Sequence, residues 1–233
     1  MIELDHVTYG YAEVKVSFSL AVAPSTFAAI IGPSGGGKST LLSLIAGFLT
    51  PASGHIRLAG ADMAGVPPAR RPVSMIFQDH NAFAHLDLWR NVALGISPSL
   101  RLDGAQRKLV DRALERVGLS ALARRLPGEV SGGERQRIAI ARALVRDRPI
   151  LLLDEPFAAL GPALRADMIA LLGEVQRERR LTVLIVTHDP QEARRAASHT
   201  AFLADGRILA YAETEKLLVR KDLPELARYL GDG

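Results

Sequence analysis

The sequence Gly32-Pro33-Ser34-Gly35-Gly36-Gly37-Lys38-Ser39-Thr40 decides how this chain folds. An apolar run at residues 27–31 precedes it, and a second run with apolar residues at 41, 42, 44 and 45 follows it. This order predicts a strand, a glycine-rich loop and a helix. It is the context in which the pattern G-x-x-x-x-G-K-[ST] indicates a phosphate-binding loop.

The residue types of this loop suit the binding of a nucleotide's phosphates. Glycine reaches backbone angles closed to other residues, so successive N–H groups can turn toward an anion, and the helix start adds the positive end of its dipole. Lys38 brings a full charge to the β- and γ-phosphates, and the Ser39 hydroxyl is placed to bind Mg²⁺. The alternative is a glycine-rich linker that happens to precede a lysine, and the flanking strand and helix patterns favour the phosphate loop.

Composition limits the remaining possibilities. The 233 residues, 48% apolar and 23% charged, are typical of a folded globular protein. There is no cysteine, which excludes disulfides and thiol chemistry. The first residues, Met1 to Asp5, include two acids and no long apolar segment, so no signal peptide is predicted and the protein is expected in the cytosol.

Neither a membrane span nor a nucleic-acid surface is predicted. Residues 16–37 carry no charge, but the apolar residues from Val16 to Val22 alternate with small or polar ones, which is the period of a strand. The net charge of +4 is modest, and the arginine clusters lack interleaved aromatic residues that could stack on bases. We therefore expect no nucleic-acid partner.

The order of predicted elements indicates a mixed α/β domain. Residues 1–22 alternate like antiparallel strands, whereas residues 150–153 and 182–186 are continuous apolar runs, as expected of parallel strands covered on both faces. Asp205-Gly206 lies between two apolar segments and predicts a hairpin.

A helical segment interrupts this domain. Asp103 and Gln106 form a predicted capping box before a helix with one apolar face. We predict a single domain over residues 1–233, with a core of about residues 1–85 and 150–233 and a helical subdomain of about residues 86–149.

Two adjacent carboxylates, Asp154 and Glu155, end the apolar run at 150–153. Successive side chains on a strand point to opposite sides, so the two are expected to have different tasks. Asp154 is the candidate Mg²⁺ partner, and Glu155 is the candidate general base for a water that attacks the γ-phosphate. The alternative is a strand that simply becomes polar where it meets solvent.

A second glycine-bearing turn, Ser131-Gly132-Gly133-Glu134, precedes an apolar-periodic helix. Ser131 and Glu134 predict a capping box, and the two bare glycine amides predict a further anion site without a lysine of its own. One chain then carries two half-sites for phosphate. This suggests that two copies share each nucleotide.

Two more residues end predicted strands. His188 follows the run at 182–186 and is a candidate contact to the γ-phosphate, although a lone histidine is usually structural. Gln78 follows the segment 72–77, and its amide oxygen could reach the metal or the water.

Together these residues resemble the ATP-binding subunits of ABC transporters. Five elements occur in that family's order, namely residues 32–40 (Walker A), Gln78 (Q-loop), residues 130–134 (signature), residues 150–155 (Walker B) and His188 (switch histidine). The resemblance spans essentially the whole chain. It implies a P-loop ATPase of ABC type, with a mixed core sheet flanked by helices, an antiparallel β edge and a helical subdomain.

The resemblance also implies roles for individual residues. ATP and Mg²⁺ are the implied cofactors, with catalysis by Glu155, His188 and Gln78 and metal binding by Ser39, Gln78 and Asp154. ATP would contact the whole Walker A segment and Tyr11, which falls near the position where an aromatic ring stacks on adenine; Tyr9 is the competing choice. The signature, Ser131 to Glu134, would act on the partner's ATP.

The implied partners are those of an importer. Two copies would close head to tail over two ATP, drive a pair of membrane-spanning permease subunits and depend indirectly on a periplasmic solute-binding protein. The implied location is the cytoplasmic face of the cell inner membrane. Apolar side chains of the loop at residues 83–89 are candidates for docking the permease, and local core packing is the alternative.

A narrower resemblance concerns the solute. Residues 47–54, residues 67–75 and Leu126-Pro127-Gly128-Glu129 resemble the ATPases of thiamine importers. Thiamine, or its phosphate esters, is therefore the expected solute, and import of another small solute is the alternative.

Three segments of the chain depart from the family pattern. Val130 and Glu134 stand where Leu and Gln are usual, Ser25-Thr26 replaces a common Gly-Glu, and Gly161 stands where the family's D-loop carries Asp. The last departure puts tight coupling between the two ATP sites in doubt.

Two other function classes compete with transport. A soluble ABC-type ATPase of translation or DNA repair usually carries two ATPase modules or a long coiled-coil insertion, and this chain has neither. An unrelated P-loop kinase would need an acceptor pocket rather than the Ser131 turn and His188.

Overall fold

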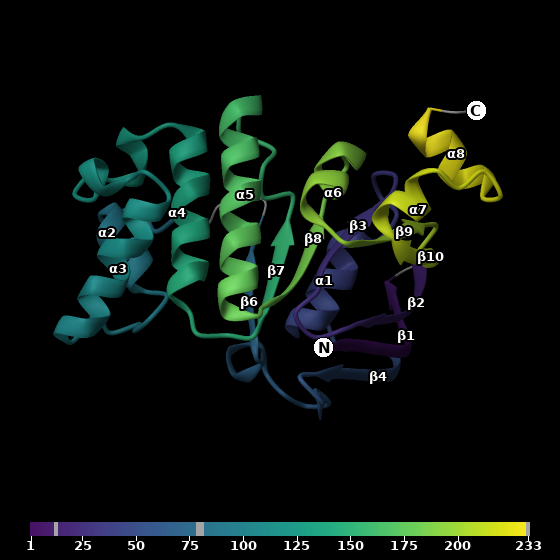
Figure 1. The fold of residues 1–233 in the computed structure, drawn as a ribbon. Coiled ribbons are helices and arrows are strands. Elements are labelled where there is room, and N and C mark those ends of the chain that lie inside the picture. Colours follow the sequence, from purple (N-terminus) through teal and green to yellow (C-terminus); the bar gives the residue numbers. More distant parts are fainter. Residues whose placement is uncertain (12–13, 78–81, 232–233) are drawn as a thin grey trace.

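A ten-stranded sheet forms the centre of the molecule (Figure 1). The computed structural model describes residues 1–11, 14–77 and 82–231. The strands in chain order are β1 (Ile2–Tyr11), β2 (Val14–Val22), β3 (Phe27–Ile31), β4 (Ser53–Leu58), β5 (Ala61–Asp62), β6 (Val73–Ile76), β7 (Ile150–Asp154), β8 (Thr182–Val186), β9 (His199–Ala204) and β10 (Arg207–Glu213).

The sheet has a parallel part and an antiparallel part, in the order β5-β4-β1-β2-β10-β9-β3-β8-β7-β6. Strands β9, β3, β8, β7 and β6 run parallel to their neighbours in this part, while β5, β4, β1 and β2 pair antiparallel. A single parallel bridge, Arg207 to Ser17, joins the two parts. The mixed sheet with an antiparallel edge that the sequence predicts is confirmed.

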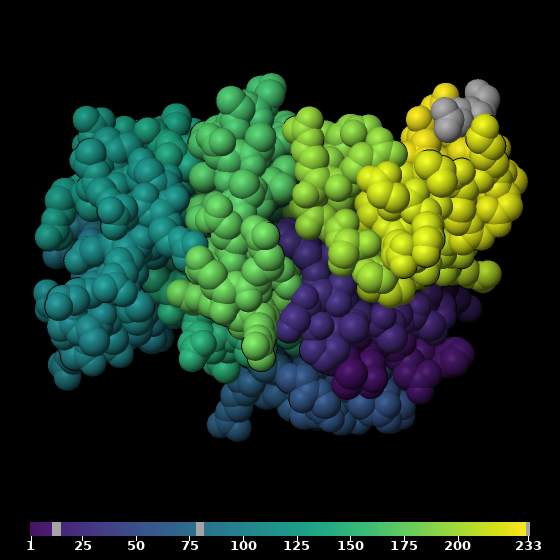
Figure 2. Space-filling model, viewed as in Figure 1, coloured from purple at the N-terminus to yellow at the C-terminus, as the bar shows by residue number. Residues whose placement is uncertain are grey.

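Helices cover both faces of the sheet. They are α1 (Lys38–Ala46), α2 (Leu88–Ala93), α3 (Gly104–Arg116), α4 (Gly132–Val145), α5 (Pro162–Arg179), α6 (Pro190–Ala196), α7 (Thr214–Leu218) and α8 (Pro224–Leu230), with short 3₁₀ turns at Pro68–Arg70, Ser120–Leu122 and Pro127–Glu129. In the space-filling view the segment that contains α2 and α3, coloured teal, gathers at one end of the molecule (Figure 2).

The two faces of the central strands belong to two hydrophobic clusters. Ala29, Leu151 and Ile185 pack into the larger cluster, which includes residues of α2 to α8. Their neighbours Ala28 and Leu152 pack into the smaller cluster, which includes α1 and the antiparallel strands. Because successive side chains of a strand alternate between faces, strands buried on both sides are apolar at every position.

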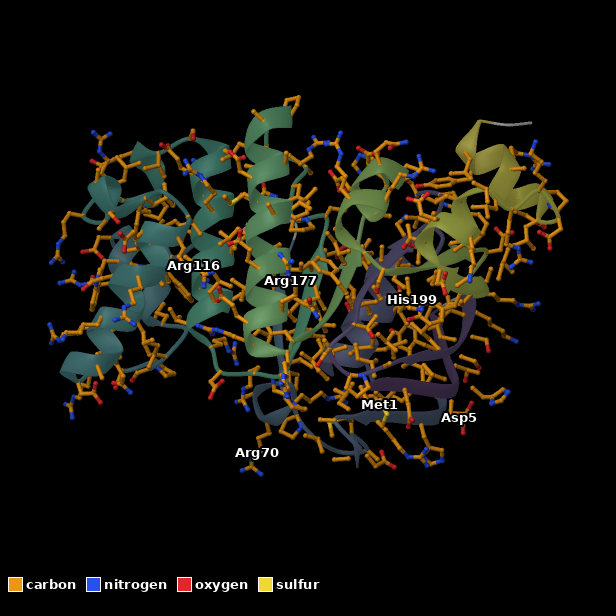
Figure 3. The ribbon with its side chains drawn as sticks, in the orientation of Figure 1. Met1, Asp5, Arg70, Arg116, Arg177 and His199 are labelled. Atoms are coloured by element: carbon orange, nitrogen blue, oxygen red, sulfur yellow. The ribbon has the colours of Figure 1, made fainter. Side chains whose placement is uncertain are left out.

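The helical segment is held to the core by ionic and packing contacts. Helices α2, α3 and α4 pack against one another. Arg116, at the end of α3, forms a bidentate pair with Glu178 of α5, with N–O distances of 3.0 and 3.2 Å (Figure 3). The division into a core and a helical subdomain remains a prediction.

Local sequence signals account for several element ends. The capping boxes of α3 and α4, Asp103 with Gln106 and Ser131 with Glu134, are both formed. Gly47 ends α1 in the left-handed conformation, at φ 87°. Within the described residues, every helix is too short or too polar to cross a lipid bilayer.

Candidate nucleotide-binding site

The phosphate loop follows β3 and leads into α1, as the sequence predicts. Its first residue, Gly32, leaves no room for a side chain, because a Cβ atom there would lie 1.9 Å from the backbone oxygen of Leu203. Gly37, with φ 105°, precedes the helix in a conformation that L side chains rarely adopt. The glycines therefore set a path that a substituted loop could not follow.

The start of α1 is open to an anion. Gly37 offers no side-chain cap, so the first N–H groups of the helix have no hydrogen-bond partner from this position. The nine-residue helix points this end at a cavity of about 590 Å³. The cavity is lined by Ser34, Gly35, Gly37, Lys38, Ser39, Thr40, Glu155 and His188. Its walls combine a helix start and a lysine, the features that bind phosphate.

Lys38 is held over the loop rather than in solvent. It is 7% exposed, and its ammonium group donates to the backbone oxygens of Gly32 and Pro33, both at 2.8 Å. Burial lowers the pKa of Lys38, while the carboxylates of Glu155 and Asp154 oppose that shift. The ammonium group is thus positioned before a nucleotide is present.

Asp154 and Ser39 form the candidate metal-binding pair. Asp154 is 8% exposed at the end of β7, and the Ser39 hydroxyl hydrogen-bonds to its carboxylate. Burial raises the pKa of Asp154, and the Ser39 hydrogen bond opposes this shift. Among the described residues, no group of three or more His, Cys, Asp or Glu side chains could hold a metal ion. The oxygen donors present suit Mg²⁺, which keeps several waters and phosphate oxygens as ligands.

Glu155 leaves the strand and turns into the cavity. Its φ of 45° lies in the left-handed region, and its backbone N–H donates to the oxygen of Val186 at 3.0 Å. The carboxylate lies 3.3 Å from Nδ1 of His188, whose side chain is 62% exposed. Sparsely populated backbone angles of this kind cluster at functional sites. The Glu155 carboxylate therefore lines the cavity, and Asp154 lies beside it, next to Ser39.

A buried network behind His188 had no signal in the sequence. The Thr187 hydroxyl donates to the carboxylate of Glu192, and Arg165 of α5 pairs with Glu192 at 3.2 Å and with Asp189 at 3.5 Å. Arg165 also donates to the backbone oxygen of Leu160 at 3.2 Å. The network joins residues from distant parts of the chain, so no local pattern could indicate it.

The second glycine-bearing turn lies outside this cavity. The backbone N–H and the hydroxyl of Ser131 both donate to the Glu134 carboxylate, at 2.7 and 2.8 Å. These two hydrogen bonds lower the pKa of Glu134. Gly133 packs against Leu160, since a Cβ atom there would lie 3.2 Å from the leucine side chain. The segment Ser131 to Glu134 is not among the residues that line the phosphate cavity.

Two predicted site residues cannot be placed. Gln78 lies outside the described residues. Tyr11 ends β1, but its side chain is not described. The competing choice, Tyr9, pairs with Val16 of β2 and lines a separate cavity of about 420 Å³ with Lys15 and Arg207.

Comparison with known proteins identifies the family. A family model described as ABC transporter matches residues 16–158, and curated sequences match nearly the whole chain. The chain belongs to the ABC transporter family. The cassette is 52% identical over 230 residues to the thiamine import ATP-binding protein ThiQ of Mesorhizobium japonicum, covering 99% of this chain and 91% of the relative.

Further relatives and solved structures agree. The ThiQ protein of Salmonella typhimurium is 50% identical over 218 residues, which cover 94% of the cassette and 93% of the relative. Two dimeric structures of the ABC transporter cassette MJ0796 each superpose with a TM-score of 0.83 at 30% identity, covering 92% of this chain and 99% of that chain. One of them is described as a post-hydrolysis state bound to ADP and Pi.

The loop before α2 combines exposed and buried apolar side chains. Phe83 is 48% exposed, and its backbone N–H donates to the buried amide oxygen of Asn91 at 2.8 Å. Arg142 lies over the Phe83 ring at 5.6 Å. Leu88 is fully buried in the larger core cluster, and the indole N–H of Trp89 donates to Asp111 at 2.7 Å. Leu88 therefore packs in the core and does not form part of a docking surface. Phe83 is exposed at the surface of the cassette.

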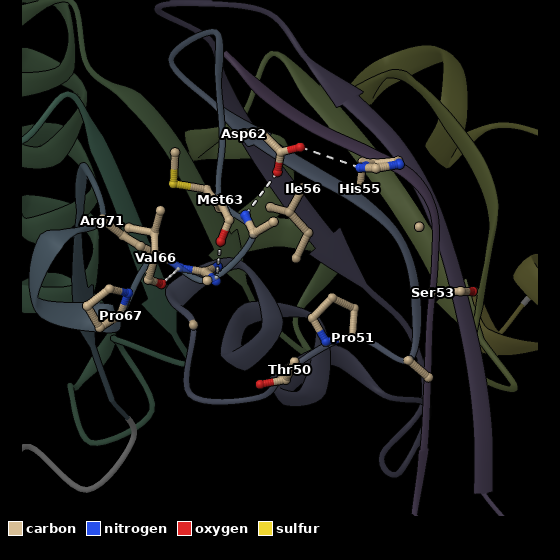
Figure 4. Close-up of a pocket in the computed structure, with 15 residues that line it drawn as sticks. Thr50, Pro51, Ser53, His55, Ile56, Asp62, Met63, Val66, Pro67 and Arg71 are labelled. Atoms are coloured by element: carbon tan, nitrogen blue, oxygen red, sulfur yellow. Dashed lines mark hydrogen bonds and ion pairs between the residues drawn. The ribbon is translucent and has the colours of Figure 1, made fainter.

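A cavity of about 410 Å³ lies at the opposite end of α1 (Figure 4). Arg71 borders this cavity and is 5% exposed. Its guanidinium group donates to four backbone oxygens. These are Leu44 at 2.8 Å, Ile45 at 2.9 Å, Val66 at 3.0 Å and Met63 at 3.2 Å. The last turn of the phosphate-binding helix is thus tied to the loop after β5.

Proposed function

We propose that this cassette is the ATP-hydrolysing subunit of a bacterial importer for thiamine or its phosphate esters. The observation that carries ATP hydrolysis is the cavity lined by Lys38, Glu155 and His188, with the Asp154 carboxylate beside it against Ser39. The solute rests on the near-complete match to thiamine import ATP-binding proteins. Import of another small solute is the alternative.

The phosphates would lie on the loop from Gly32 to Thr40. The open start of α1 and the Lys38 ammonium group would hold the β- and γ-phosphates, because both present positive charge to the same cavity. Tyr11, or Tyr9 in its place, would stack on adenine. Binding would cost little conformational entropy at Lys38, because hydrogen bonds to the backbone oxygens of Gly32 and Pro33 hold its side chain.

Mg²⁺ would be held by Ser39 and Asp154, with Gln78 as a further ligand. The bound ion would supply neutralisation of the charge that develops on the phosphates. The Ser39 hydroxyl and the Asp154 carboxylate already lie within hydrogen-bond contact of each other. Moving the Ser39 hydroxyl away from the carboxylate, with its proton retained, would free one oxygen of each residue for the cation.

Glu155 would act as the general base toward the attacking water. Its carboxylate faces the cavity, and His188 lies 3.3 Å away on the side open to solvent. A base placed in this way typically contributes roughly 10²–10⁴-fold to the rate. His188 and Gln78 would position the water and the γ-phosphate.

A second copy of the chain would complete the site. The solvent-open cavity contains no residue of Ser131, Gly132, Gly133 or Glu134, although these residues present a helix start suited to an anion. Head-to-tail pairing would bring the signature of one copy onto the nucleotide of the other. The dimeric assemblies of the cassette MJ0796 support this arrangement.

The cassette would lie on the cytoplasmic face of the inner membrane as a peripheral subunit. Phe83 offers an exposed ring beside the buried Asn91, which would suit docking of a permease segment. A periplasmic solute-binding protein would deliver the solute to the permease and touch the cassette only indirectly. No nucleic-acid partner is proposed.

Thiamine uptake tests the solute. We expect deletion of the gene, in a strain unable to make thiamine, to raise the external thiamine needed for growth. The wild-type gene should restore uptake of radiolabelled thiamine, and the Glu155→Gln variant should not. Unchanged uptake in the deletion strain would favour another solute, and a cassette that does not co-purify with a polytopic membrane protein would favour a soluble ABC-type ATPase.

A further inference from the structure

The C-terminal helix α8 lies next to α7, on the side of the molecule where β9 and β10 lie (Figure 1). Leu226 anchors this helix, since it is fully buried in the larger core cluster. The ring of Tyr229 packs 5.6 Å from the ring of Phe202, which pairs across β9 and β3 with Ile31. Ile31 directly precedes the phosphate loop, so the last helix brings an aromatic side chain to the edge of the nucleotide site.

The Tyr229 hydroxyl is tied to the backbone of that site. It donates to the backbone oxygen of His188 at 2.8 Å. Burial raises the pKa of Tyr229, the backbone N–H of Gly32 near the phenolic oxygen opposes this, and the charges of Asp189 and Glu155 add to the rise. The phenol therefore remains protonated and able to donate at neutral pH.

The contacts of Tyr229 bear on the backbone positions of both His188 and Gly32. The His188 side chain is mostly exposed, so its position relative to Glu155 depends on where its backbone is held. The backbone of Gly32 lies close to the backbone oxygen of Leu203, with no room for a Cβ atom between them. The phenol thus closes a chain of contacts from β9, through the phosphate loop, to the switch histidine.

We propose that Tyr229 is a positioning residue for ATP hydrolysis, which holds the backbone of His188 in register with the start of the phosphate loop. The proposal rests on the proposed role of His188. It makes the end of the chain part of the catalytic apparatus, although the residue touches no reacting atom.

Tyr229→Phe tests the proposal, because it removes the hydroxyl and keeps the ring on Phe202. A lost neutral hydrogen bond corresponds to a roughly 2–10-fold lower kcat. We expect that loss in the full-length protein, with an ATP affinity, measured by a fluorescent ATP analogue, within about twofold of wild type. Tyr211→Phe is the matched control, since Tyr211 is also half-buried but packs on His199 of the sheet, and it should leave kcat unchanged.

A double-mutant cycle separates positioning from a general structural role. In a His188→Ala background, measured in single turnover, Tyr229→Phe should no longer change the rate. A wild-type kcat for Tyr229→Phe, or an equal loss with and without His188, would overturn the proposal. If His188→Ala alone leaves hydrolysis unchanged, the proposed role of His188 fails first, which distinguishes the two failures.

Discussion

The carboxyl group of Asp154 lies in a buried environment that disfavours its ionised form. Burial raises its pKa, and this cost is largest when no cation is bound. A carboxyl whose pKa is raised on folding favours the folded state when it is protonated and disfavours it when it is ionised. The ionised carboxylate thus lowers the stability of the nucleotide-free protein, and in the proposed function the same charge would bind Mg²⁺.

We predict that Asp154→Asn raises the melting temperature of the nucleotide-free protein at pH 8. Each kcal/mol gained corresponds to roughly 2–4 °C for a chain of this size. The gain should shrink as the pH falls through the folded pKa toward the ordinary value of 3.8, because wild-type Asp154 is then protonated. Thermal melts across pH 4.5–8 measure this, and a gain that grows toward low pH would contradict it. Asp205→Asn, in an exposed hairpin, is the control.

Glu155→Gln should separate binding from hydrolysis. The amide keeps the size of the side chain but cannot accept a proton, so we expect turnover to fall by roughly 10²–10⁴-fold with ATP affinity preserved. Phosphate release and binding of a fluorescent ATP analogue measure the two effects. Lys38→Ala should instead weaken binding itself, because it removes the cation that lines the cavity. A Glu155→Gln variant that hydrolyses ATP at the wild-type rate would remove Glu155 from the role of base.

At the scale of residues, sequence reasoning reached what a local pattern encodes. The sequence spacing expected for phosphate and metal binding is met by Lys38, Ser39, Asp154 and Glu155. The structure brings these four residues close together. Tyr229 was missed, because its partners lie far away in the chain and an isolated aromatic residue has no pattern of its own.

At the scale of elements, the phosphate-binding helix α1 depends on both of its ends. The start faces the cavity, and the end is tied down by Arg71, which supplies donors for the oxygens of Leu44 and Ile45. The last carbonyls of a helix have no partner within the helix. A buried guanidinium group that satisfies them also fixes the direction in which the helix points.

Arg71→Met should therefore destabilise the protein. The change keeps much of the side-chain volume but leaves four backbone oxygens without this donor, at a cost of about 3 kcal/mol or more. At roughly 2–4 °C per kcal/mol, the melting temperature should fall by roughly 6–12 °C. Arg70→Met, at the exposed neighbouring position, is the control and should change it little. Equal melting temperatures for the two variants would exclude the proposed tie.

Elements were more predictable than their arrangement. Alternating and continuous apolar runs indicated the strands, and the two capping boxes marked helix starts correctly. The hairpin of β9 and β10 was predictable from Asp205-Gly206, but the pairing of β10 with β2, through one bridge between Arg207 and Ser17, was not. Strand order depends on contacts between distant segments rather than on local propensity.

At the scale of the whole molecule, packing links the two half-sites. Gly133 packs on Leu160, whose backbone oxygen accepts from Arg165, and Arg165 pairs with Glu192, close to His188 in the chain. In the proposed dimer, a displacement of the turn at Ser131–Glu134 by the partner would therefore reach the proposed hydrolysis site through these contacts. This path gives a physical route for coupling even though Gly161 replaces the usual Asp.

Gly161→Asp should change the cooperativity of hydrolysis. The position has φ −66°, and nothing lies within 4 Å of a Cβ atom there, so Asp fits without strain. Asp would also cap α5, which adds a few tenths of a kcal/mol to stability. Gly161→Asn caps in the same way without the charge and serves as the control. We expect the Hill coefficient for ATP to change with Asp and not with Asn; an unchanged coefficient for both would show that the charge does not couple the sites.

The bond between Ser131 and Glu134 bears on how two copies would separate. The Ser131 hydroxyl already donates to a carboxylate of its own chain, so in the proposed dimer a bound triphosphate would compete with Glu134 for this hydroxyl. After release of the γ-phosphate, the Ser131 hydroxyl would again donate to the Glu134 carboxylate. We therefore expect the closed dimer to be stable while ATP is intact and to dissociate readily after hydrolysis.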